Sequence, residues 1–489
     1  MRFGPRPMKL SELVRSVEYK AFIGQDVECT GISYDSRRVA PGDLFVCVPG
    51  YNWDGHAFAD DAVKAGAVAL IVQRQLAVSV PQVVVPNSRE AMALVSLRFY
   101  NNPSSRLELY GVTGTNGKTT TTHLIRAILE GSGRRCGLIG TIENIIGGQR
   151  LPVEHTTPEA PDLQRLFHLM SRAGDEACSM EVSSHALEMH RVTGCQFDVG
   201  VFTNLTQDHL DFHGSLDSYR RAKARLFEML DKDDTAVLNA DDPASEFFAG
   251  ATTARVVTYG TRASSEFRAE DISISAGSTE YTLISPVYTG RVVVSVSGRF
   301  NVYNSLAALA ACTAQGVDAK TAIEALRLQK GVPGRFETVY RGAFSVIVDY
   351  AHTPDGLLNV LKSARELTSG RLIVVFGCGG DRDRTKRPIM GKIGTTLADV
   401  AIITSDNPRS EDPEAIIEEV LAGAREGPGE YTCETDRRQA IFSAIRLARE
   451  KDVVVIAGKG HETYQIFRDR TIHFDDKEVA REALEALGI

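Results

Sequence analysis

Residues 111–123 read GVTGTNGKTTTTH, and this stretch decides how the centre of the chain folds. The apolar run 107–112 before it predicts a strand, and residues 120–130 after it predict a helix. A glycine-rich turn between a strand and a helix forms a cradle for phosphate groups, because backbone N–H groups and the helix dipole attract the anion. Lys118 would add a point charge to this cradle, and the Thr119 hydroxyl would reach Mg²⁺.

The stretch departs from the phosphate-loop pattern G-x-x-x-x-G-K-[ST] at its first glycine. Residues 117–119 fit the pattern, but Val112 stands where the first glycine belongs, with Gly111 and Gly114 nearby. The alternative is an ordinary glycine-rich turn. The context of strand, turn and helix favours nucleotide binding.

The composition of the 489-residue chain excludes several classes of protein. Hydrophobic residues make up 43% of the chain, which is enough for more than one core, and the length suggests about three domains. The net charge of −8 argues against a nucleic-acid partner. The eight cysteines are scattered without a C-x-x-C pair, which indicates reduced thiols and a cytoplasmic location. No apolar run reaches transmembrane length, so we expect no membrane insertion.

Changes in pattern predict three α/β domains: residues 1–104, 105–332 and 333–489. The stretches NNPSS (101–105) and GVPG (331–334) are typical of linkers. The middle and last domains alternate apolar strands with helices, which is typical of mostly parallel sheets. Residues 250–297 are rich in Ser, Thr and Val and predict an antiparallel β excursion. In the first domain, Met8 is an alternative start, because an amphipathic pattern begins at Leu10.

Three polar residues follow the phosphate loop in the chain. Each alone is weak evidence for a catalytic site, and their occurrence in this order after GTNGKT is stronger evidence. Glu181, in MEVSSHAL, stands where a carboxylate would hold Mg²⁺, although acids at strand ends also serve as caps. His209 follows a strand predicted at 199–202, and a lone His–Asp pair is more often structural. Lys223 lies in YRRAKARLF, and a lysine on a helix is solvated by default.

The last domain carries four polar strand ends: DYAHTPD (349–355), GCGGDRDRTKRPIMG (377–391), SDNPRSEDP (405–413) and GKGHE (458–462). Open α/β sheets carry their sites at such ends. Asp349 would accept a hydrogen bond from a ribose hydroxyl, and His352 would contact the nucleotide. Arg409, on an Asn-Pro turn, suits bidentate carboxylate recognition. Its alternative is a cap of the next helix near Glu414. Residues 377–391 form a glycine-rich turn with alternating acidic and basic residues, and the alternative interpretation of this turn is a second, unrelated phosphate loop.

These motifs stand in one order along nearly the whole chain, together with TTP (156–158), GRFNVYN (298–304), GRFE (334–337) and the N-terminal DSRRV and GDLFV. The set resembles the Mur ligases of peptidoglycan synthesis, and within them the members that add meso-2,6-diaminopimelate. The resemblance implies a uridine-binding N-terminal domain, a central P-loop-like ATPase domain, and a Rossmann-like C-terminal domain that brings the amino acid.

The resemblance also implies an activity. A monomeric, ATP-dependent ligase would join meso-2,6-diaminopimelate to the D-Glu carboxylate of UDP-N-acetylmuramoyl-L-Ala-D-Glu through an acyl phosphate. The reaction belongs to cytoplasmic peptidoglycan precursor synthesis, and hence to cell-wall growth, cell shape and cell division.

The matching positions take their expected roles from the same resemblance. ATP would be bound by Gly114, Thr115, Asn116, Gly117, Lys118, Thr119, Thr120, Asn301, Asn304, Arg335, Asp349 and His352. Mg²⁺ would be held by Thr119, Glu181, His209 and Lys223, the lysine being carboxylated by CO₂ to an anionic carbamate. Lys118, Glu181, His209 and Lys223 would thus be the catalytic residues. The UDP-substrate would be bound by Ser36, Thr156, Thr157, Ser183 and Arg191, and diaminopimelate by Arg382, Asp406, Asn407, Arg409, Gly458 and Glu462.

Two departures and two rivals accompany this interpretation. Met189 and His155 stand where family members often carry Gln and Asn, which affects the fine detail of substrate contact. Folylpolyglutamate synthetase has a similar central domain, but the uridine-binding segment and DNPR argue against it. A noncatalytic nucleotide-dependent scaffold is the other rival, and the intact catalytic positions argue against that.

Overall fold

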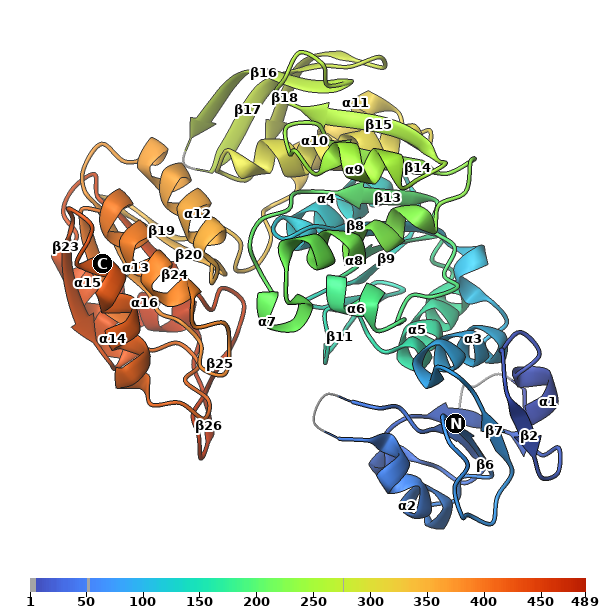
Figure 1. Ribbon diagram of the computed structural model, residues 1–489. Helices are drawn as coiled ribbons and strands as arrows, with labels where there is room; N and C mark the ends of the chain where they lie inside the picture. The colour runs from blue at the N-terminus through green and yellow to red at the C-terminus, as the bar shows by residue number, and fades with distance from the viewer. Residues whose placement is uncertain (1–5, 51–52, 276) are drawn as a thin grey trace.

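A computed structural model describes residues 6–50, 53–275 and 277–489, which form three α/β bodies in a row (Figure 1). Each body is built on its own main sheet. The predicted α/β class with a mostly parallel central sheet is confirmed. None of the helices in these ranges is long and apolar enough to cross a membrane.

The first body contains a five-stranded sheet in the order β2-β7-β6-β5-β4. The four strands β4, β5, β6 and β7 run parallel to one another, and β2 pairs antiparallel with β7. The helix α3 (Ser88–Phe99) packs its apolar side against this sheet. The strands are β2 (Ala21–Ile23), β4 (Gly31–Ser33), β5 (Asp43–Val46), β6 (Ala69–Val72) and β7 (Gln82–Val84).

The central body is an eleven-stranded sheet with β8 (Glu108–Thr113) in its parallel core. Strands β12 (Ala177–Glu181) and β13 (Val199–Phe202) flank β8. Apolar residues cover both faces, with α4 and α10 on one side and α5 and α8 on the other. These helices are α4 (Lys118–Gly131), α5 (Ala160–Ala173), α8 (Leu216–Glu228) and α10 (Phe300–Ala314).

The β excursion extends the central sheet. Within this excursion, β17 (Ser278–Ile284) pairs antiparallel with β16 (Phe267–Ser275) and with β18 (Thr289–Val294). The strand β15 (Arg255–Gly260) runs parallel to both neighbours. The remaining strands of this sheet are β9 (Cys136–Ile139), β10 (Asn144–Ile146), β11 (Gln149–Leu151) and β14 (Thr235–Asn239).

The last body is a six-stranded sheet in the order β19-β20-β24-β21-β22-β23, with only β19 antiparallel. The four predicted buried strands are present as β20 (Ser345–Asp349), β21 (Leu372–Phe376), β22 (Val400–Thr404) and β24 (Val453–Ala457). One face packs against α12, α13 and α14, the other against α15 and α16. The other elements are β19 (Glu337–Arg341), β23 (Glu430–Glu434), α12 (Pro354–Leu367), α13 (Lys386–Leu397), α14 (Pro413–Ala424), α15 (Arg437–Leu447) and α16 (Asp476–Glu485).

The segment 101–105, whose sequence is typical of a linker, is packed in the structure. Pro103 and Ser104 are buried at the start of the short 3₁₀ helix η3 (Pro103–Arg106). Asn101 and Asn102 turn the chain in the left-handed region, with φ of 57° and 45°. Asparagine tolerates this conformation better than most residues, which explains why the turn signal was correct although the segment is held in place.

Candidate active site between the central and last sheets

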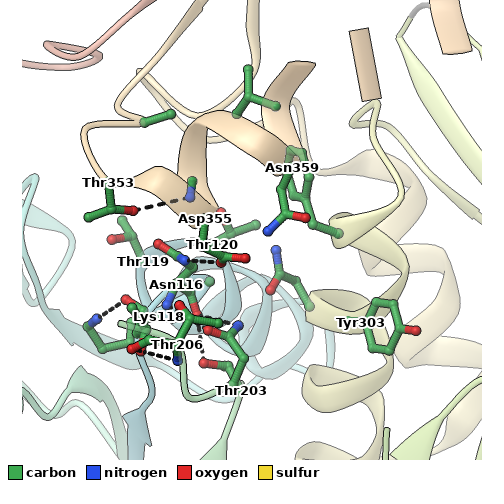
Figure 2. Close-up of a pocket in the computed structure, with 18 of the residues that line it drawn as sticks. Asn116, Lys118, Thr119, Thr120, Thr203, Thr206, Tyr303, Thr353, Asp355 and Asn359 are labelled. Atoms are coloured by element: carbon green, nitrogen blue, oxygen red, sulfur yellow. Dashed lines mark hydrogen bonds between the residues drawn. The ribbon is translucent and has the colours of Figure 1, made fainter. Parts of the chain in front are cut away.

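A cavity of about 840 Å³ lies between the central body and the last body. The loop before α4, the C-terminal ends of β12 and β13, and the start of α12 all line it. Figure 2 shows Lys118 and Asn116 from the central side facing Asp355 and Asn359 from α12. The ends of parallel strands converge here, as expected for an open α/β sheet.

The phosphate loop has room for glycine alone at two positions. Gly114 and Gly117 adopt φ of +149° and +87°, where other residues are strained. A Cβ on Gly114 would lie 1.9 Å from the Thr203 hydroxyl oxygen, and one on Gly117 would lie 2.5 Å from Asn304 Oδ1. The helix α4 begins directly after Gly117, two residues before the predicted start. The loop therefore presents backbone N–H groups at a helix N-terminus, a geometry that fits phosphate.

Lys118 and Lys223 converge on the same carbonyl of this loop. Lys118 Nζ donates to Gly114 O at 2.9 Å and to Thr115 O at 2.8 Å. Lys223 Nζ donates to Gly114 O at 2.8 Å, and its side chain is buried. Burial, with Lys118 nearby, holds the pKa of the Lys223 amine well below its usual range. The default expectation of a solvated Lys223 is therefore wrong, because α8 turns this residue toward the loop.

Glu181 and Thr119 stand at the cavity from neighbouring elements. Glu181 ends β12, and its carboxylate accepts from the Thr141 N–H at 2.8 Å and the Thr141 hydroxyl at 3.0 Å. The Thr119 hydroxyl oxygen accepts from Arg335 at 3.1 Å, so a residue of the last body reaches into the phosphate loop. The Arg335 guanidinium also lies 4.4 Å from the centre of the Tyr350 ring.

His209 stands opposite in the same cavity with Asp208 beside it. Its Nε2 lies 3.3 Å from Asp208 Oδ2, and its backbone is left-handed, with φ of 53°. Burial holds the pKa of His209 below its usual range, which keeps the imidazole neutral, the form that binds metals. Within the described ranges, no group of three or more His, Cys, Asp or Glu side chains is arranged to hold a metal. The Thr119 hydroxyl and the Glu181 carboxylate are oxygen donors of the kind that Mg²⁺ prefers.

The residues expected at the nucleotide fall into two groups. Asn304, Arg335 and His352 line the cavity. Asn301 is buried and accepts from Asn304 Nδ2 at 2.9 Å, so it holds Asn304 in place. Asp349 also reaches the cavity, but its two oxygens accept from the N–H groups of the following turn and of the GRFE segment at 2.7 and 2.6 Å.

Sequence reasoning missed several residues of this cavity. Asp355 and Asn359 come from α12, and Asn116 Nδ2 donates to Asp355 Oδ2 at 2.7 Å across the two bodies (Figure 2). Tyr303 donates to Asp241 at 2.9 Å on the opposite wall. Asp355 stands in the quoted DYAHTPD motif, which was a signal for it. Tyr303 likewise stands in the quoted GRFNVYN motif, whereas Asp241 lies in no quoted motif.

Four of the residues expected at the UDP-substrate lie around the C-terminal end of β12, namely Thr156, Thr157, Ser183 and Arg191. The Thr157 hydroxyl donates to Glu181 O at 2.8 Å, and Arg191 donates to Thr157 O at 2.8 Å. Thr156 and Ser183 line the cavity. Arg191 also lies 3.7 Å from Met189 Sδ, so the departure at 189 touches the expected substrate arginine.

Ser36 lies in the first body, on the 3₁₀ helix η1 (Ser36–Arg38). The ion pair between Arg38 and Glu154 at 2.7 Å joins this turn to the segment that leads into Thr156. This ion pair connects the first body to the segment before Thr156, and Ser36 itself is not among the described residues that line the cavity.

The residues expected at diaminopimelate gather at the ends of β22 and β24. Asn407 Nδ2 donates to Glu462 Oε2 at 3.0 Å, and Gly458, with φ of +124°, lets Asp406 approach β24 closely. Arg409 donates to Gly380 O at 2.8 Å and has no carboxylate partner among the recorded ion pairs of the described residues. Asp412, not Arg409, caps the next helix. Arg382 is exposed and donates to Asp381 O at 2.9 Å.

Comparison with known proteins places this geometry in a family. The model of the Mur ligase middle domain matches residues 112–312. The models of the Mur ligase, glutamate ligase domain and of the Mur ligase family, catalytic domain match residues 334–460 and 28–100.

Three known proteins show how similar this chain is to its relatives. The UDP-N-acetylmuramoyl-L-alanyl-D-glutamate–2,6-diaminopimelate ligase of Geobacillus thermodenitrificans (strain NG80-2) is 50% identical over 486 residues, covering 98% of this chain and 99% of that one. A solved structure of an enzyme with the same name is 34% identical, with a TM-score of 0.69, covering 99% of this chain and 100% of that one. The Mycobacterium tuberculosis folylpolyglutamate synthase complexed with ADP and AMPPCP is 20% identical, with a TM-score of 0.61, covering 76% of this chain and 92% of that one, and shares the fold alone. The chain therefore belongs to the Mur ligase family.

Proposed function

We propose that this protein is the ATP-dependent ligase that joins meso-2,6-diaminopimelate to the D-Glu carboxylate of UDP-N-acetylmuramoyl-L-Ala-D-Glu. The observation that carries the proposal is the cavity, where the phosphate loop faces the last body. Asp406, Asn407 and Glu462 stand at strand ends of that body, outside the set of residues that lines the cavity. The names of the relatives with about half their residues identical support the choice of amino acid. The cytoplasmic location and the monomeric state belong to the same proposal.

The first step is phosphoryl transfer from ATP to the D-Glu carboxylate. The carboxylate oxygen attacks the γ-phosphorus, the bond to the β–γ bridging oxygen breaks, and ADP leaves with the electron pair. Lys118, the backbone of the loop 114–119 and Arg335 would position the phosphates and balance their charge, which the convergence of Lys118 and Arg335 on this loop supports. Thr119, Glu181, His209 and a carboxylated Lys223 would hold Mg²⁺, which supplies charge neutralisation when it is bound.

The carbamate on Lys223 follows from the chemistry of a buried amine. Only a neutral amine attacks CO₂, forming an N–C bond and releasing one proton. The depressed pKa of Lys223 favours that neutral form at physiological pH. A carbamate would replace a lysine charge that burial disfavours with an anion that suits a cation site.

The second step is amide formation. The amine of diaminopimelate attacks the carbonyl carbon of the acyl phosphate, and phosphate leaves as the amide forms, with one proton released. Asp406, Asn407 and Glu462 would orient the amino acid, and Arg409 would pair with its far carboxylate. Acyl phosphates hydrolyse readily, so the contact between Asn116 and Asp355 supports a role for the two bodies in excluding water.

A ligation assay tests the proposal directly. Purified protein receives ATP, Mg²⁺ and the UDP-substrate, with meso-diaminopimelate, L-lysine or L-ornithine in separate reactions. We expect ADP release to depend on both the UDP-substrate and diaminopimelate, and the product to gain the mass of diaminopimelate less water. ATP hydrolysis independent of the UDP-substrate, or preference for lysine, would contradict it.

A further inference from the structure

Lys459 is a buried cation within the cluster expected to bind the amino acid, and no role described so far uses it. Its side chain is 0% exposed, at the end of β24. Lys459 Nζ donates to Asn407 Oδ1 at 3.0 Å and to Tyr464 O at 2.7 Å, and lies 3.5 Å from Asp406 Oδ1. Lys459 thus donates two hydrogen bonds and is ion-paired with two carboxylates, since Glu462 Oε2 also lies 3.8 Å from its Nζ.

These contacts determine which way the Asn407 amide faces. Asn407 Oδ1 accepts from Lys459 Nζ and from the Ile466 N–H, both at 3.0 Å. Neither donor can accept, so the oxygen must face them and the Nδ2 group must face Glu462, to which it donates at 3.0 Å. An amide turned the other way would put Nδ2 against an ammonium and Oδ1 against a carboxylate.

Lys459 also ties the cluster to a neighbouring hairpin formed by β25 (Tyr464–Ile466) and β26 (Thr471–His473), which extends from the last body in Figure 1. Besides the bond to Tyr464 O, the Arg409 N–H donates to Ile466 O at 3.0 Å. Gln465 Nε2 donates to Asp406 O at 2.7 Å. The hairpin therefore lies along segment 406–409, with Lys459 buried between them.

We propose that Lys459 is a positioning residue for the amino-acid substrate, acting by holding the Asn407 amide and the Glu462 carboxylate in their binding orientation. The inference rests on the proposed function, because diaminopimelate is the ligand that these two groups would meet. The alternative role is a counter-ion that stabilises the fold without orienting anything. The two roles differ in which kinetic constant changes when Lys459 is replaced.

The test measures the KM for each of the three substrates in Lys459→Met. We expect the KM for meso-diaminopimelate to rise about 10- to 100-fold, the range for a lost hydrogen bond to a charged group. The KM values for ATP and the UDP-substrate should stay within about twofold. Ile445→Ala is the matched control, because it removes buried apolar volume on α15 in the same body without contact to the cluster. It should lower the melting temperature and leave all three KM values near wild type.

A double-mutant cycle separates positioning from simple stabilisation. If Lys459 acts through Asn407, Lys459→Met should raise the diaminopimelate KM by less than about threefold in an Asn407→Ala background. Lys459→Gln, which keeps a donor, serves if the methionine variant does not fold, and its diaminopimelate KM should rise by a smaller factor.

An unchanged diaminopimelate KM in a folded Lys459 variant would overturn the inference, and so would fully additive effects with Asn407→Ala. A lower kcat and a lower melting temperature with an unchanged diaminopimelate KM would also overturn the inference. Failure of the wild-type enzyme to use diaminopimelate would contradict the proposed function instead, so the two failures are distinguishable.

Discussion

Two lysines from different helices, α4 and α8, reach the Gly114 carbonyl, and their surroundings assign them different chemistry. Lys118 follows the glycine turn at a helix N-terminus, where an ammonium complements phosphate. Burial lowers the pKa of both amines, and it holds the pKa of Lys223, behind the same loop, well below its usual range. The same residue type would thus serve as a cation in one position and as the precursor of an anion in the other.

Replacement of Lys118 should separate catalysis from substrate binding. Lys118→Ala should reduce kcat by at least roughly 100-fold, because a positioned charge at the phosphates is lost. The affinity for the UDP-substrate, measured by calorimetry, should stay near wild type, since its uridine contacts are expected in the first body. A fall in that affinity as large as the fall in activity would contradict the assignment.

Replacement of Lys223 should give a loss that a small carboxylate reverses in part. Lys223→Ala should be nearly inactive in an ADP-release assay, and bicarbonate should not restore it, because no amine remains to carry the carbamate. Acetate should restore part of the activity by filling the vacated space with an anion. Lys118→Ala is the control and should not respond to acetate. A bare ammonium on Lys223 in an active crystal with bound metals would refute the carbamate.

Arg409 should decide between diaminopimelate and lysine. The extra carboxylate of diaminopimelate can pair with the guanidinium, a charge-assisted contact worth roughly 1.5–3 kcal/mol. In Arg409→Ala and Arg409→Lys, the ratio of kcat/KM for diaminopimelate to kcat/KM for lysine should therefore fall roughly 10- to 150-fold. Arg468→Ala is the control, because Arg468 contacts the same segment through Ser410 O. A preference equal to wild type in both Arg409 variants would make the assignment wrong.

At the scale of single elements, α12 matters because it carries Asp355 and Asn359 to the cavity. Pro354 begins the helix, and the Thr353 hydroxyl accepts from the Gly356 N–H at 3.1 Å as its N-cap. The first turn of α12 therefore sets where the two polar side chains stand.

Loss of this cap should affect stability and nucleotide binding together. Thr353→Ala should cost about 1 kcal/mol of folding free energy and raise the KM for ATP several-fold, as the first turn frays. Asp412→Ala removes the corresponding cap of α14, none of whose residues lines the cavity. It should cost a similar free energy in thermal unfolding without changing the KM for ATP. Equal KM effects in both variants would mean that the cap acts only through stability.

Sequence patterns predicted these elements well where the signal is local. Four apolar runs became β20, β21, β22 and β24, because buried parallel strands are apolar on both faces. The burial of Lys223 was not predictable, because flanking alanines look the same on an exposed or a buried side of a helix. The burial of Lys459 was not predictable either, because two of its partners, Asp406 and Asn407, lie more than 50 residues away.

At the scale of the whole molecule, the cavity depends on how two bodies meet. Arg335 reaches Thr119, and Asn116 reaches Asp355, each across the boundary. Such contacts join residues 216 and 239 positions apart, so no local pattern announces them. The architecture was still predicted, because the set of motifs carries the family resemblance that implies three domains. The four polar motifs of the last body also follow parallel strands, whose ends share one edge of the sheet.

The strand order of the last body leads to a prediction about incomplete chains. A chain that stops before residue 453 lacks β24, which pairs with both β20 and β21. We expect limited proteolysis to digest such a chain beyond residue 332 while the central body stays protected. A matched chain ending at residue 475 keeps every strand of that sheet and should protect more of the last body. Equal protection of both chains would contradict the importance of the late strand.

The position of β24 also has a consequence during protein synthesis. It is the last strand of its sheet to leave the ribosome, yet it lies between β20 and β21. Until it emerges, the pair β19–β20 and the trio β21–β22–β23 have no strand to join them. The central sheet needs none of these residues. A nascent chain should therefore be able to bind nucleotide phosphates before it can bind an amino acid. The amino-acid substrate can then be used only once synthesis of the chain is nearly finished.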